Sequence, residues 1–70
     1  MTKNEIFEII SHAVKEINPA EKITLFSSLK DKFDDLDIIL IKLYIEDYFK
    51  RDINIDINNI NDLVEYIYKG

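Results

Sequence analysis

The 70-residue sequence contains one glycine, at its last position, and one proline, Pro19. Sandwiches and barrels made of β-strands need a turn about every 8–12 residues, and glycine and proline supply much of that turn chemistry. Apolar residues make up 47% of the chain, which is too many for a disordered acidic segment. The sequence therefore predicts an all-α fold, in a single domain that spans residues 1–70.

Three stretches of the chain show the spacing of helices. We predict helices over residues 3–17, 35–49 and 62–69. Thr2 and Glu5 form the pattern of a capping box before the first helix, in which each side chain bonds to the backbone amide of the other residue. Asp34 and Asn61 are favourable N-caps for the second and third helices.

Two segments between these helices lack a helical period. Residues 18–33 carry scattered apolar side chains that we expect to pack back onto the helices, with a short helical turn near Ser27–Lys32. Those side chains are Ile23, Leu25, Phe26, Leu29 and Phe33. Residues 50–60 alternate isoleucine with polar residues, which we interpret as an extended crossing with Ile53, Ile55 and Ile57 on the core. The alternative is a strand edge that pairs with a second copy of the chain.

The helix predicted over residues 35–49 is apolar around most of its circumference. Only Asp37, Lys42, Glu46 and Asp47 interrupt the apolar surface. Such a helix either lies at the centre of a bundle or presents an apolar face to a partner. A domain this small cannot easily cover it on every side.

The charge and length of the chain exclude several functions. Nine basic and fourteen acidic side chains give a net charge of -5, which argues against nucleic-acid binding and favours a basic protein partner. No apolar stretch has the length of a membrane span, and the N-terminus lacks the pattern of a signal peptide. Together with the absence of cysteine, these features predict a cytoplasmic protein.

The residue types mark no independent catalytic site. His12 is the single histidine and is interpreted as an exposed helix residue. The serines lack a nucleophile elbow and a histidine partner. Four aspartates lie near the second helix, namely Asp31, Asp34, Asp35 and Asp37. They lack the glycine and the distal glutamate of a calcium loop, so we interpret them as helix-capping acids. We predict that the chain is not an enzyme and holds no metal.

A long connection, the run Asp34-Asp35-Leu36-Asp37 and an apolar helix that ends at Phe49 together resemble the acyl and peptidyl carrier proteins. In that family the helix opens with Asp-Ser-Leu, often followed by Asp, and the serine carries a 4'-phosphopantetheine arm. Leu36 matches the leucine of the motif, and Phe49 matches a late aromatic residue. The apolar core positions of the family fall on Ile39, Ile41 and Ile45. The run from Ile60 to Ile67 resembles the last helix, so the resemblance covers essentially the whole chain.

The chain departs from the family where the cofactor is attached. Asp35 stands in place of the modified serine, and a carboxylate lacks the hydroxyl that attacks coenzyme A. No cofactor is therefore expected. The segment from Phe49 to Tyr66 is also shorter than in the family. The resemblance thus implies a small three- to four-helix bundle with a long first connection and a reduced or missing third helix.

The resemblance implies a partner and a docking surface. In the family, acidic residues of the motif helix meet basic patches on enzymes. The corresponding candidates here are Asp34, Asp35, Leu36, Asp37, Leu40, Leu43, Glu46 and Asp47. We expect a non-covalent binding or scaffold module, monomeric or weakly dimeric, for an acyl- or aminoacyl-processing enzyme with a basic or apolar docking patch. The alternative is that these acids only cap and solvate the helix.

Other hypotheses remain open. One is a working carrier that bears 4'-phosphopantetheine, either because Asp35 replaces a natural serine or because another serine is used. The register Ser28-Leu29 restores a serine but puts Lys42 in place of the late aromatic residue. Another is an unrelated helical interaction domain, which predicts a helical hairpin without a long connection between the first two helices. A third treats Asp35 as a fixed negative charge in place of the phosphodiester.

Overall fold

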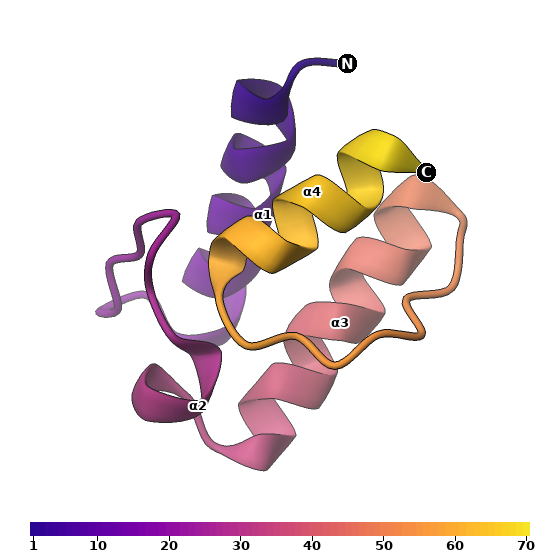
Figure 1. Cartoon of the computed structure of the whole chain (residues 1–70). Helices are drawn as coiled ribbons and strands as arrows, with labels where there is room; N and C mark the ends of the chain where they lie inside the picture. The colour runs from indigo at the N-terminus through magenta and orange to yellow at the C-terminus, as the bar shows by residue number, and fades with distance from the viewer.

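A computed structural model describes all 70 residues and shows four helices and no strand. The helices are α1 (Lys3–Ile17), α2 (Leu29–Lys32), α3 (Asp35–Phe49) and α4 (Ile60–Lys69). Figure 1 shows α4 crossing in front of α1, with α3 beside them and the short α2 near the start of α3. The predicted all-α fold is confirmed, and so are the bounds predicted for the first two long helices. None of the four helices combines the length and the apolar character needed to cross a membrane.

Helix α1 is the central element of the bundle. It begins with the predicted capping box: the Thr2 hydroxyl accepts a hydrogen bond from the Glu5 amide (3.2 Å), and the Glu5 carboxylate accepts one from the Thr2 amide (2.9 Å). Its buried face carries Ile6, Ile10, Ala13 and Val14. Both α3 and α4 pack against this helix, so most of the core is built around it.

Helix α3 lies at the edge of the bundle rather than at its centre. The Asp34 carboxylate caps it by accepting a hydrogen bond from the Asp37 amide (2.8 Å), as the sequence predicts. Only Ile41 and Ile45 are buried on this helix. The helix ends at Lys50, whose left-handed conformation (φ 55°) turns the chain into the next segment. Of the two roles considered for this helix, the structure supports the one with an exposed apolar face.

The first connection packs onto the helices only in part. Leu29 and Phe33 are buried and Ile23 is partly buried, as expected. For Leu25 and Phe26 the expectation is wrong, because both side chains are exposed, that of Phe26 to 86%.

A local turn explains the exposure of Phe26. The Ser27 hydroxyl accepts a hydrogen bond from the Thr24 amide (2.8 Å), and the Thr24 hydroxyl accepts one from the Phe26 amide (3.3 Å). Ser27 is buried by this arrangement, and the residue before it points to solvent. A turn stabilised by serine and threonine side chains therefore outweighs the tendency of the phenylalanine to be buried.

Helix α4 begins two residues earlier than predicted. Asn59, and not Asn61, caps it by accepting a hydrogen bond from the Asp62 amide (2.9 Å). The earlier start is stabilised by the first connection, whose carbonyl groups accept hydrogen bonds from the first amides of the helix. These backbone bonds run from Ile60 to Ser27 (3.1 Å) and from Asn61 to Leu25 (2.9 Å). The predicted inward positions Leu63, Val64 and Ile67 are buried.

Residues 50–59 form an extended crossing between α3 and α4, which we name the crossing segment. Ile53 and Ile57 are buried and Ile55 is partly buried, so the predicted contact of alternate isoleucines with the core is confirmed. The segment contains no helix. The third helix that the resemblance implies as reduced or missing is therefore missing from this part of the chain.

An ion pair between the first and last helices makes the stability depend on pH. The Lys3 ammonium lies 2.6 Å from the Glu65 carboxylate, and this hydrogen bond holds the pKa of Glu65 below its ordinary value of 4.5. A lowered carboxyl pKa stabilises the fold above that ordinary value, and the stabilisation is lost as the pH falls through the folded-state pKa. We expect the urea midpoint of wild type to exceed that of Glu65→Gln at pH 7, and the difference to disappear near pH 3. A difference that persisted at pH 3 would contradict this assignment.

Candidate protein-binding surface

The outer face of α3 carries a row of exposed leucines. Leu36, Leu40 and Leu43 follow one another at steps of four and three residues, so they lie on one side of the helix. Their exposed fractions are 65%, 42% and 55%. Ile41 and Ile45 occupy the opposite side and face the core. We name the three leucines the leucine stripe.

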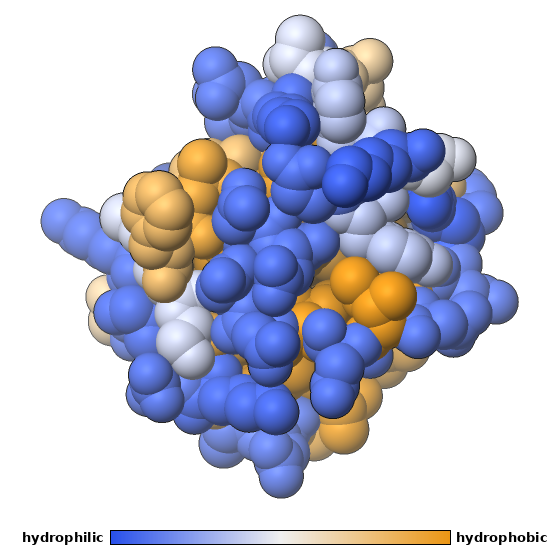
Figure 2. Space-filling model, in the orientation of Figure 1, coloured by the Kyte–Doolittle hydropathy of each residue, from blue (hydrophilic) through white to orange (hydrophobic).

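Further apolar side chains extend the stripe on both sides. Ile39, Tyr44 and Tyr48 are exposed on the same helix. Figure 2 shows apolar side chains interrupting the hydrophilic surface in the region where α3 and the crossing segment lie. Single exposed apolar residues are normal on a folded protein, but a contiguous apolar patch marks a binding site. This face of α3 therefore has the character of a docking surface.

The carboxylates expected to accompany the leucines have different environments. Asp34 is used as the helix cap, and Asp47 forms an exposed ion pair with Lys50 (3.4 Å). Glu46 lies on another side of the helix, where its carboxylate accepts a hydrogen bond from the Ile53 amide (2.7 Å). This bond connects α3 to the crossing segment. The structure thus brings Asp47 to the leucine stripe and separates Glu46 from it.

Asp35 is exposed and makes no hydrogen bond or ion pair within the chain. It lies in the first turn of α3, where the positive end of the helix dipole favours a negative charge. Its side chain presents two carboxylate oxygens and no hydroxyl group. The position that would bear a phosphopantetheine arm in a carrier protein is therefore accessible but lacks the atom that forms the bond.

The alternative serine has a different structural setting. Ser28 precedes the four-residue helix α2, which ends at Lys32 before the chain turns into α3. Ser28 is partly buried and is bridged to Asn59 through the backbone. The Ser28-Leu29 register therefore places its serine before a short helix and not at the start of the long one.

The remaining polar residues form no further site. His12 is exposed on α1, in agreement with its interpretation as an exposed helix residue. No three or more histidine, aspartate or glutamate side chains are grouped closely enough to hold a metal ion. The chain matches no protein-family model, and no curated protein or solved structure is significantly similar to it.

The extent of the apolar surface exceeds what the sequence predicted. Ile39, Tyr44 and Tyr48 lie outside the set of candidate binding residues. The available signal was the helical period, because residues that flank a stripe by one position on a helix of 3.6 residues per turn share its edge. Ile39 was assigned to the core through the resemblance, but 54% of its surface is exposed.

Proposed function

We propose that this chain is a carrier-like module without an attachment serine, which binds a protein partner through the leucine stripe and carries no covalent cargo. The exposure of three regularly spaced leucines on one side of α3 is the observation that carries the proposal. Burial of such side chains contributes about 25 cal/mol per Å² of apolar surface, so a complementary apolar patch would be bound favourably.

The charges near the stripe define the kind of partner. Asp34, Asp35 and Asp37 lie together at the first turn of α3, and Asp47 lies near its other end. A partner surface with apolar side chains and basic residues beside them would complement both features. The resemblance to carrier proteins favours an acyl- or aminoacyl-processing enzyme as that partner.

One structural observation bears on the choice between a carrier-like module and an unrelated hairpin domain. Residues 18–34 separate α1 from α3 and contain the short helix α2. A helical hairpin would join two long helices through a short loop. The long connection supports the carrier-like arrangement over the hairpin.

Incubation with coenzyme A and a promiscuous phosphopantetheinyl transferase tests whether the chain carries cargo. We expect the intact mass of wild type to remain unchanged, because the Asp35 carboxylate cannot replace the serine hydroxyl as the attacking group. A genuine carrier protein in the same reaction confirms that the transferase is active. A mass gain on wild type would contradict the proposal, and peptide mapping would then identify the modified residue.

The variant Asp35→Ser examines the recognition surface in the same reaction. If the rest of α3 retains the features that the transferase requires, this variant gains the mass of phosphopantetheine. Asp35→Ala serves as the matched control, since it removes the carboxylate without adding a hydroxyl. Binding that is lost in Asp35→Ala and kept in Asp35→Glu would indicate that partners recognise a negative charge at this position.

A further inference from the structure

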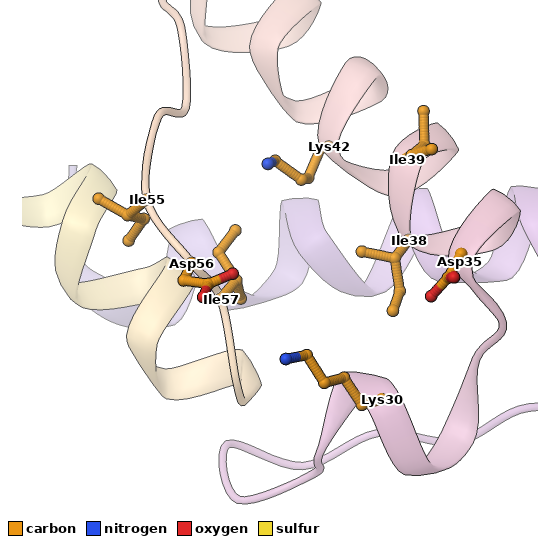
Figure 3. Close-up of a pocket in the computed structure, with 8 residues that line it drawn as sticks. All are labelled: Lys30, Asp35, Ile38, Ile39, Lys42, Ile55, Asp56 and Ile57. Carbon is orange, nitrogen blue, oxygen red and sulfur yellow. The ribbon is translucent and has the colours of Figure 1, made fainter.

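A groove runs along the junction between α3 and the crossing segment. It joins two neighbouring hollows of about 340 and 190 Å³, which share Ile39 and Lys42 in their walls. Its apolar lining comes from Ile38 and Ile39 on α3 and from Ile53, Ile55 and Ile57 on the crossing segment. Figure 3 shows the part near α2, where side chains from three elements surround an open space. We name this feature the isoleucine groove.

The crossing segment offers free backbone groups along this groove. The N–H and C=O groups of residues 54–57 take part in no hydrogen bond within the chain. Both ends of the segment are held in place, because the Ile53 amide donates to Glu46 (2.7 Å) and the Asn58 carbonyl accepts from Leu29 (3.1 Å). An extended segment that is fixed at its ends and unpaired between them is an edge onto which another extended chain can add.

Two lysines line the groove without a charged partner. Lys30 comes from α2 and Lys42 from α3, and neither forms an ion pair within the chain. Both side chains extend into the open space in Figure 3. Among the nearby carboxylates, Glu46 is bonded to the Ile53 amide, while Asp35 and Asp56 are exposed and paired with neither lysine. A carboxylate on an occupant would therefore meet two available ammonium groups.

We propose that the isoleucine groove binds an extended peptide segment of a partner protein, in which branched apolar residues alternate with acidic residues. The backbone of the peptide would pair with residues 54–57, its apolar side chains would contact the isoleucines, and its carboxylates would bind Lys30 and Lys42. This site borders the leucine stripe but is separate from it. The proposal therefore holds or fails independently of the proposed function.

The length of the groove agrees with this occupant. Its α3 wall extends from Asp35 to Glu46, which at 1.5 Å per residue is about 16 Å. Five residues in an extended strand also span about 16 Å, at roughly 3.3 Å per residue. The opposite wall consists of Ile53–Ile57, which is five residues of the same extended backbone. A pentapeptide would thus cover the groove from one end to the other.

The test uses the acetylated and amidated pentapeptide Val-Glu-Val-Glu-Val and the full chain. We expect saturable binding, with amide and methyl chemical-shift changes confined to residues 53–57 and to Ile38, Ile39 and Lys42. A peptide N-methylated at the central valine should bind at least about tenfold more weakly, because it loses a main-chain donor. The peptide Val-Lys-Val-Lys-Val should also bind at least about tenfold more weakly, because its charges oppose the lysines.

Protein variants assign the binding to the groove. Lys42→Gln keeps most of the side-chain length and removes the charge, so it should weaken binding of the glutamate peptide about tenfold. Lys15→Gln changes an exposed lysine on α1 and should leave binding unchanged. Absence of saturable binding, equal binding of the N-methylated or lysine peptide, or shift changes confined to the leucine stripe would each overturn the proposal.

Discussion

Replacing Ile41 with alanine is expected to lower the free energy of unfolding by about 2–5 kcal/mol. Ile41 is fully buried, and together with Ile45 it provides the buried contacts of α3 with the rest of the core. A domain of this length has a total stability of roughly 4–10 kcal/mol, so the substitution should remove a large part of it. Urea unfolding followed by circular dichroism at 222 nm measures the change.

The neighbouring residue supplies the control for this experiment. Leu40 is 42% exposed on the opposite side of the same helix. Leu40→Ala removes a similar apolar volume but leaves no buried cavity, so its effect should stay within about 1 kcal/mol. Equal losses from Leu40→Ala and Ile41→Ala would mean that the leucine stripe is buried in solution, by the fold itself or by a second copy of the chain.

Replacing Leu40 with aspartate is expected to weaken binding to the partner enzyme by at least about tenfold, without unfolding the chain. A charged group at the centre of an apolar contact must lose its water on binding, and that cost is not recovered on an apolar patch. Surface plasmon resonance against purified acyl- and aminoacyl-processing enzymes measures the effect. Because Leu40 is exposed, circular dichroism should show the same helix content as wild type.

Leu25→Asp is the matched control for this substitution. Leu25 is also an exposed leucine, but it lies on the first connection and not on α3. It should leave binding unchanged if the leucine stripe is the docking surface. Equal weakening by Leu25→Asp and Leu40→Asp would place the docking surface elsewhere or extend it across both regions.

The parts of the fold that could be predicted from the sequence depend on local signals. The capping box of Thr2 and Glu5 and the Asp34 cap each act within one turn of the chain, so the sequence shows them directly. Alternation of isoleucine in the crossing segment is equally local, and Ile53 and Ile57 are buried as expected. The bounds of α1 and α3 follow from these signals.

The parts that could not be predicted depend on contacts between distant residues. Asn59 and Asn61 are both good caps, and the choice between them depends on hydrogen bonds from the first amides of α4 to the first connection. The bond from Ile53 to Glu46 likewise joins two segments across the end of α3. No local pattern reports such a bond. For this reason Glu46 was grouped with the acids of the docking surface.

The candidate site could be predicted more completely than the identity of its partner. Leu36, Leu40 and Leu43 were proposed as binding residues, and all three are exposed. Their exposure follows from the sequence, because an apolar helix in a small domain has too little core to cover it. The partner is encoded in a surface that belongs to another protein. Binding by these residues therefore stays a prediction.

The hydrogen bonds between the first connection and the end of the crossing segment have a consequence for how the chain folds. Leu29, Ile60 and Asn61 donate to carbonyl groups about thirty or more positions away in the sequence, so neither connection is ordered until the other is in place. Both connections must then become ordered in a single cooperative step, together with the docking of α4. Folding should consequently be slower than in a bundle whose helices are joined by short loops, where most contacts are local.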